Sequence, residues 1–159
     1  MEQSHNKDLI FRKAGKGDIP NIVKLLADDE FGSKREDYKI SLPKVYCDAF
    51  QNIFQDKNQE LIIIENFNKE IIGTLQLTFI QYLTYQGGLR AQIEAVRIKK
   101  KFRGKDFGKK IFKWAIKRSI DKGAHLVQLT SDKQRPDAIE FYKALGFRDS
   151  HVGMKLNLL

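Results

Sequence analysis

The sequence lacks the features that would place the protein outside the ordinary globular class. It has one cysteine, Cys47, so neither an internal disulfide nor a cysteine-based zinc site can form. The longest wholly aliphatic run, residues 61–64, is far too short to span a membrane. The polar residues 1–9 also lack the apolar core of a secretory signal. We therefore expect a cytoplasmic protein that neither enters nor binds a membrane.

Length and composition are those of a globular chain. A chain of 159 residues is expected to form one domain, which we place over residues 1–159. A domain of this size buries about 68–70% of the surface that its unfolded chain exposes, so it needs no disulfide or metal for stability. Apolar residues make up 42% of the sequence and charged residues 31%, which argues against a disordered or fibrous protein.

Positive charge is concentrated in one short stretch. The formal net charge is +9, and residues 99–110, KKKFRGKDFGKK, hold seven basic residues and one acidic residue. An excess of this kind indicates an anionic partner such as nucleic acid, a membrane surface or a phosphorylated ligand. Because the excess is local, it favours a compact polyanion. A solvated basic surface is the alternative.

Hydrophobic periodicity and turn residues divide the chain into strands and helices. Strands are expected at residues 10–14, 60–67, 70–81, 89–98 and 125–130, with further strand material at 147 and 153–159. Helices are expected after Asp18, an N-cap with Pro20 in the first turn, and at residues 42–55, 108–122 and 136–145. Residues 28–39 and 82–88 are expected to be loops. The order β-α-α-β-β-β-α-β-α-β-β predicts an α/β fold in which a central mixed sheet carries helices on both faces.

The basic stretch lies where such folds bind anions. It joins the carboxyl end of a strand to the start of a helix, which offers unpaired amides and about half a positive charge. Gly104 and Gly108 would let the backbone approach a ligand closely. They are one residue too close together for a Walker A motif, in which Lys110 would also replace the magnesium-binding hydroxyl. The GxGxxG fingerprint is missing too, so a nucleotide triphosphatase and a classical dehydrogenase are disfavoured.

Two motifs about 30 residues apart carry a family resemblance. Residues 103–108, RGKDFG, match the ends of the pattern Q/R-x-x-G-x-G/A, with Asp106 in place of its central glycine. Residues 135–147, RPDAIEFYKALGF, match N-x-x-A-x-x-x-Y followed by x-x-x-G-F, with Arg135 in place of Asn. In these motifs and in their order of elements the sequence resembles the GNAT superfamily of N-acetyltransferases. Within that superfamily it looks most like the aminoalkylphosphonate-type enzymes. The resemblance covers essentially the whole chain, and its specific part is 93–147.

The resemblance implies a reaction and a cosubstrate. Such a protein moves an acetyl group from acetyl-CoA to a primary amine, on a small molecule or a peptide, by direct attack on the thioester. The first motif would grip the pyrophosphate of coenzyme A, and a backbone amide near Val96 would face the oxyanion. The residues expected to bind the cofactor are Val96, Ile98, Arg103, Gly104, Lys105, Asp106, Phe107, Gly108, Lys109, Arg135 and Ala138. No metal is expected.

Two residues are candidates for proton transfer. Glu94 is an isolated acid in an apolar strand, two residues before Val96 and hence expected on the same face, where it could act as a base directly or through water. It could instead face solvent or pair with Arg97 or Arg90. By the resemblance, Tyr142 is the acid that protonates the leaving thiolate, and a phenol with a pKa near 10 holds its proton at pH 7. The alternative is that Tyr142 belongs to an ordinary helical core stripe.

The acceptor and the assembly are less defined. Tyr82, Tyr85 and His151 are candidate acceptor contacts, whereas His125 and Cys47 are expected to be structural. The sequence does not name the amine, and it leaves the oligomeric state open, a homodimer included. Two other functions stay possible. One is a sensor that binds acyl-CoA without turnover, which the departures at Asp106 and Arg135 would allow. The other is a nucleic-acid-binding module, disfavoured because few aromatic residues interleave with the basic ones.

Overall fold

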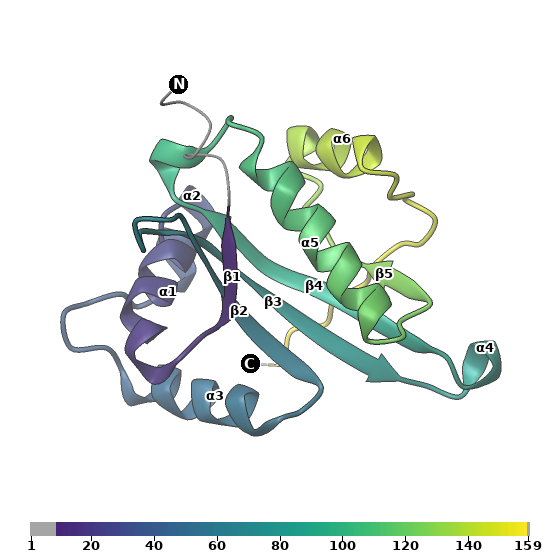
Figure 1. The fold of residues 1–159 in the computed structure, drawn as a ribbon, viewed down its shortest axis with the longest axis horizontal. Helices are drawn as coiled ribbons and strands as arrows, with labels where there is room; N and C mark the ends of the chain where they lie inside the picture. Colours follow the sequence, from purple (N-terminus) through teal and green to yellow (C-terminus); the bar gives the residue numbers. More distant parts are fainter. Residues whose placement is uncertain (1–8, 159) are drawn as a thin grey trace.

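The computed structural model describes residues 9–158, and it is built on one five-stranded sheet in the order β1-β2-β3-β4-β5 (Figure 1). Neighbouring strands are antiparallel except β4 and β5, which are parallel. The strands are β1 Ile10–Lys13, β2 Gln59–Glu65, β3 Ile71–Gln81, β4 Leu89–Ile98 and β5 Leu126–Gln128. The helices are α1 Ile19–Leu26, α2 Glu30–Arg35, α3 Lys44–Gln55, α4 Thr84–Gly87, α5 Phe107–Asp121 and α6 Pro136–Ala144. Short 3₁₀ turns precede α1 and α5, at Lys16–Asp18 and Lys100–Phe102.

Both faces of the sheet are covered, as predicted. The consecutive isoleucines of β2 show why, because successive side chains of a strand point to opposite faces. Ile63 packs with α1 and α3 in one core cluster. Ile62 and Ile64 pack with α5 in the other. A strand buried on both faces has no polar side, and β2 is accordingly an apolar run rather than an alternating one.

A bulge interrupts β4 near its carboxyl end. Gln76 of β3 pairs with Glu94, but Thr74 pairs with Arg97, so one residue of β3 lies opposite two residues of β4. The extra residue is accommodated at Ala95, whose φ of 52° is left-handed.

On its other side, β4 is only partly paired. β5 pairs with Arg90–Gln92 and then ends, so the second half of β4 has no strand beside it among the described residues. That half of the strand leads directly into the basic turn before α5. An open strip of sheet edge is thus continuous with the start of a helix.

Two of the predicted loops contain short elements. Residues 30–35 form α2, because the side chain of Asp29 accepts a hydrogen bond from the Gly32 amide at 2.5 Å. Glu30 in its first turn and Arg35 in its last also suit the helix dipole, so the sequence did carry a helix signal. The element labelled α4 is a tight turn in which Tyr85 and Gln86 have left-handed φ values.

The strand material predicted at 147 and at 153–158 is not formed, and residue 159 of that prediction lies outside the described residues. Gly146, with φ 95°, closes α6 as expected, but residues 148–158 contain no strand. The apolar alternation at 153–158 has the correct period for a strand. A strand also needs a neighbour to pair its backbone, and the described part of the chain offers none to this segment.

Candidate active site

The turn before α5 presents unpaired backbone amides. Asp106 occupies the N-cap with φ 61°, and its side chain makes no capping hydrogen bond. The first intrahelical bond runs from the Lys110 amide to the Asp106 carbonyl, which leaves the amides of residues 107–109 without helical partners. Gly104 has φ 72°, a conformation that glycine adopts without strain. The turn therefore has the geometry of an anion site.

Three of the basic side chains of this stretch are held by the protein itself. The Arg103 guanidinium donates to the Ile98 carbonyl at 2.8 Å and lies 3.2 Å from an Asp28 carboxylate oxygen. Lys101 and Lys99 both reach Glu70, at 2.5 and 3.3 Å, and they hold the pKa of that carboxyl below its usual value.

Two lysines of the turn are not held in this way. Lys105 and Lys109 are exposed and form no ion pair within residues 9–158. Of the predicted cofactor contacts in the turn, these two lysines thus have side chains free to meet an anion. Arg103 instead ties the turn to the end of α1.

Two further motif residues, Phe107 and Gly108, pack the turn and the start of α5 against the rest of the protein. Phe107 is buried in the core, with Phe102 packed against its ring edge to face. Gly108 lies against α6, where an added Cβ would come within 3.3 Å of the Phe141 ring. The missing side chain of Gly108 therefore lets α5 pack closely on α6. A cofactor contact by Phe107 is left to its backbone amide.

The bulge in β4 separates Glu94 from Val96. Val96 and Ile98 pack against the α5-side core. Glu94 lies opposite Gln76 and shares the other face with Arg97, so the predicted common face of Glu94 and Val96 is wrong. Left-handed φ at an alanine costs about 1–3 kcal/mol, and such strain concentrates at functional sites.

The Glu94 carboxylate itself is exposed and forms no ion pair within the described residues. The alternative pairings with Arg97 and Arg90 are accordingly not formed. Arg90 instead lies over the Tyr82 ring, with its guanidinium carbon 4.9 Å from the ring centroid. Glu94 therefore presents an exposed carboxylate at a strand edge, where it could accept a proton.

Tyr142 lies on α6, about one turn after Ala138, and is half-buried. Its ring packs with Phe112 and Phe147, so it does belong to a core stripe. Its hydroxyl nevertheless makes no hydrogen bond to a described residue. Burial raises the pKa of Tyr142, with a smaller opposing effect from Arg135 and Arg97. The phenol thus holds its proton at neutral pH beside two cations.

A charged cluster links three separate elements around this point. Asp29, at the start of α2, accepts a hydrogen bond from Arg135 at 3.0 Å and lies 3.6 Å from Arg97 of β4. Arg97 also donates to the Val96 carbonyl, and Arg135 lies over the Phe31 ring. Burial raises the pKa of Asp29, but the Gly32 amide and the two arginines outweigh it and hold that pKa below the usual value.

Sequence reasoning missed Asp29 and Arg97. The pattern of a helix N-cap would have identified Asp29, but nothing in the sequence indicates that it meets Arg97, 68 positions later. The cluster fastens α2 and the start of α6 to the bulged part of β4. It thus borders the candidate site on the side opposite the α5-side core.

Two of the three candidate acceptor contacts lie at the Leu89 end of β4. Tyr82 is hydrogen-bonded to His125, and Tyr85 packs on the same imidazole with ring centroids 5.0 Å apart. This aromatic group is at the Leu89 end of β4, away from the basic turn (Figure 1). His151 is exposed in the C-terminal segment and bonds only to the neighbouring serine. The structure therefore places Tyr82 and Tyr85 away from the basic turn, and it supports the structural role expected of His125.

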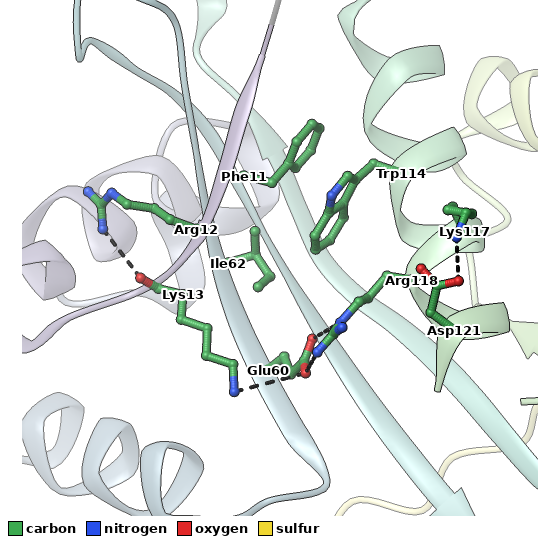
Figure 2. Close-up of a pocket in the computed structure, with 9 residues that line it drawn as sticks. All are labelled: Phe11, Arg12, Lys13, Glu60, Ile62, Trp114, Lys117, Arg118 and Asp121. Carbon is green, nitrogen blue, oxygen red and sulfur yellow. Dashed lines mark hydrogen bonds and ion pairs between the residues drawn. The ribbon is translucent and has the colours of Figure 1, made fainter. Parts of the chain in front are cut away.

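A separate hollow of about 270 Å³ lies between β1, β2 and α5 (Figure 2). Phe11 stacks on Trp114 at one side of it, and at the other the buried Glu60 accepts two hydrogen bonds from Arg118. No residue of the two motifs lines it. Within residues 9–158 there is also no group of three potential metal ligands and no helix able to cross a membrane.

Comparisons with known proteins agree with the two motifs. Residues 22–147 match the acetyltransferase (GNAT) family. The thialysine N-epsilon-acetyltransferase of Bos taurus is 27% identical over 146 residues, which cover 89% of this chain and 85% of that protein. The aminoalkylphosphonate N-acetyltransferase of Salmonella typhimurium is 27% identical over 84 residues, 53% of this chain and 54% of that protein.

Solved structures share the same fold. A transcriptional regulator from Bacillus halodurans C-125 is 50% identical with a TM-score of 0.90, covering 95% of this chain and all of that one. A Clostridium acetobutylicum protein described as an acetyltransferase and solved with acetyl-CoA is 24% identical with a TM-score of 0.72, covering 95% and 97% of the two chains. The family match over 22–147 confirms the resemblance carried by the motifs: the chain belongs to the acetyltransferase (GNAT) family.

Proposed function

We propose that this chain, as one domain over residues 1–159, transfers the acetyl group of acetyl-CoA to a primary amine by direct attack of the amine on the thioester. One observation carries the proposal. The start of α5, with its unpaired amides, directly follows the half of β4 that has no described strand on its β5 side, and Tyr142 lies beside both. Bound acetyl-CoA would supply the activated acyl group and a thiolate leaving group. The donor fits the cytoplasmic location expected from the sequence.

The turn before α5 would hold the pyrophosphate. The amides of residues 107–109 point out of the helix start, where the dipole adds about half a positive charge. Lys105 and Lys109 would neutralise further phosphate charge. The carboxylate of Asp106 opposes this, at about 1 kcal/mol for a charge 4 Å away in water. The basic side chains outnumber it, so binding is weakened rather than lost.

The open half of β4 would hold the arm that bears the acyl group. Backbone groups of an unpaired strand edge hydrogen-bond amide groups in the manner of a neighbouring strand. The bulge at Ala95 sets the orientation of the Val96 amide, our candidate donor to the oxyanion of the tetrahedral intermediate. A fixed donor of this kind stabilises charge that develops only during the reaction. Ile98 and Ala138 would complete the walls of this channel.

Proton transfer would be divided between two side chains. An alkylamine with a pKa near 10.4 is almost fully protonated at pH 7, so a base must remove a proton before attack. Glu94 is the candidate base and, since it lies on the face away from Val96, it would act through a water molecule. Tyr142 would give its proton to the leaving thiolate and regain one from the nitrogen of the tetrahedral intermediate through water, so that it is neutral again after each turnover.

The basic stretch itself does not favour nucleic-acid binding, although one solved relative is described as a transcriptional regulator. Base stacking needs exposed aromatic faces, and Phe107 is buried while Phe102 packs on it.

The acetyltransferase proposal is tested by a thiol-release assay with acetyl-CoA against polyamines, aminoglycosides, amino acids, aminophosphonates and peptides. Release with one of these classes, and a rise of melting temperature with coenzyme A, are expected. A rise of melting temperature without any thiol release would indicate an acyl-CoA sensor instead of an enzyme. The absence of both the release and the rise of melting temperature would contradict the proposal.

A further inference from the structure

Arg97 and Arg135 share a single carboxylate, that of Asp29. The Arg135 guanidinium donates to one oxygen of Asp29 at 3.0 Å, and the Nε atom of Arg97 lies 3.6 Å from the same oxygen. The other oxygen of this carboxylate already accepts the Gly32 amide. One negative charge thus faces two positive ones, and the cluster of Asp29, Arg97 and Arg135 carries an excess of positive charge.

The Arg97 side chain is not satisfied by the described part of the chain. Only 15% of it is exposed, and its buried Nε atom has no hydrogen-bond partner there. One terminal nitrogen donates to the Val96 carbonyl, which is a neutral group. Burial lowers the pKa of Arg97. Asp29 opposes this effect, but Arg135 and Arg35 act in the same direction as burial, and the pKa stays below its usual value. A mostly buried cation of this kind is stabilised by an anion beside it.

The cluster lies beside the place where acetyl transfer is proposed. Arg97 and Glu94 are on the same face of β4, on either side of the bulge. Burial raises the pKa of the Tyr142 hydroxyl, and Arg135 and Arg97 oppose it, so both cations lie near that group. The Arg135 side chain is 34% exposed and lies over the Phe31 ring, which is itself exposed. The cluster is therefore open to a molecule that arrives from solvent.

We propose that the acceptor carries an anionic oxygen group besides its amine, a carboxylate or a phosphonate, and that Arg97 and Arg135 bind this group while the amine lies by Glu94. The inference rests on the proposed acetyl transfer and adds the class of acceptor to it. A planar guanidinium matches two oxygens of such a group. A polycationic amine would meet the excess positive charge of the cluster and be repelled. Amino acids and aminophosphonates are therefore favoured over polyamines.

The first test measures thiol release from acetyl-CoA with ω-amino acids and ω-aminoalkylphosphonates of one to four methylene groups. Each is compared with a neutral amide or alcohol of equal length. For the best anionic acceptor, kcat/KM should be about 10- to 100-fold higher than for its neutral analogue, the range of a hydrogen bond to a charged group. Arg97→Gln should remove this preference, because it should raise KM for the anionic acceptor far more than for the neutral one. Arg148→Gln removes an exposed positive charge outside the cluster and should keep the preference.

Three results of this assay would overturn the proposal and leave acetyl transfer itself intact. The first is equal kcat/KM for anionic and neutral acceptors. The second is an equal loss with both in Arg97→Gln, which would mean that Arg97 only supports the strand. The third is a matching loss of acetyl-CoA affinity in this variant, which would assign the anion to the phosphates of the donor. The melting temperature shows whether the variant is folded. If it is not, Arg135→Gln, at the more exposed position, should lower the same preference.

Binding without turnover separates this inference from the proposed function. Propanoate and ethylphosphonate carry the anionic group but no amine, so they cannot be acetylated. An NMR titration followed at the arginine Nε–H signals, with and without coenzyme A, should detect binding of at least one of them. Arg97→Gln should weaken this binding about tenfold or more, and Arg148→Gln should not. Such binding without thiol release from any amine would keep the anion site and contradict acetyl transfer. Binding of neither anion, or binding that does not depend on Arg97, would overturn the site.

Discussion

Glu94 and Val96 are two residues apart in the sequence, yet their side chains lie on opposite faces of β4. The bulge at Ala95 causes this, since Thr74 and Gln76 of β3 pair with Arg97 and Glu94. In a regular strand the carboxylate would lie on the face of Val96. With the bulge it lies on the Arg97 face of an open strand edge, which favours action through a water molecule.

Replacing Glu94 by glutamine should reduce turnover about 100-fold at pH 7, at the low end of the range for a lost general base. The loss should shrink as the pH approaches the pKa of the amine, because free amine then exists without a base. Rates over pH 6.5 to 10 measure this. Glu140→Gln, an exposed carboxylate on α6, is the matched control and should have no effect. A constant ratio to the parent rate across this range would exclude Glu94 as the base.

Replacing Tyr142 by phenylalanine should lower turnover about 100-fold and leave the affinity for acetyl-CoA nearly unchanged. The ring contacts with Phe112 and Phe147 are kept, so only the proton donor is lost. Steady-state kinetics with separate measurement of acetyl-CoA binding distinguish the two quantities. Tyr38→Phe, at an exposed site, should behave like the parent chain. Unchanged turnover would leave Tyr142 with its packing role alone.

The sequence predicted what depends on local spacing. Periodicity located the five strands and both long helices, and the two motifs identified the family. It could not predict the bulge at Ala95, because alanine carries no signal for a left-handed conformation. It also could not predict the contact of Asp29 with Arg97 and Arg135, which requires the assembled fold. The predicted C-terminal strands failed for a related reason, since a correct pattern does not supply the neighbouring strand.

At Asp106 the effect of a negative charge on coenzyme A binding can be separated from the effect of a left-handed φ on stability. Asp106→Gly removes a negative charge beside the proposed pyrophosphate and also a left-handed non-glycine residue. The dissociation constant for coenzyme A should fall about fivefold, the equivalent of ~1 kcal/mol. Asp106→Asn removes the charge and keeps a side chain that tolerates this φ, so it should reproduce the gain in affinity without the gain in stability.

Isothermal titration gives the affinities of the two Asp106 variants, and urea unfolding gives their stabilities. If neither substitution tightens coenzyme A, the pyrophosphate does not lie at this turn. If only the glycine variant does so, backbone geometry and not charge limits binding.

Glu60 and Arg118, beside the hollow of Figure 2, should make the fold sensitive to acid. Burial raises the pKa of Glu60, but Arg118, Lys122 and Lys13 outweigh it, so the pKa of the folded carboxyl is below its unfolded value. A depressed folded pKa contributes stability above the unfolded pKa, near 4.3, and this contribution is lost as the pH falls through the folded value. Glu60→Gln should lower the free energy of unfolding at pH 7 by about 1.5–3 kcal/mol.

Urea unfolding at pH 7 and near pH 3 checks this sign. The difference between parent and Glu60→Gln should be full at pH 7 and smaller near pH 3, where the carboxyl of the unfolded chain is protonated. Glu30→Gln breaks an exposed pair with Lys34 and should change stability by less than about 0.5 kcal/mol at either pH. A difference that does not depend on pH would mean that Glu60 stabilises the fold by shape and hydrogen bonding, without its charge.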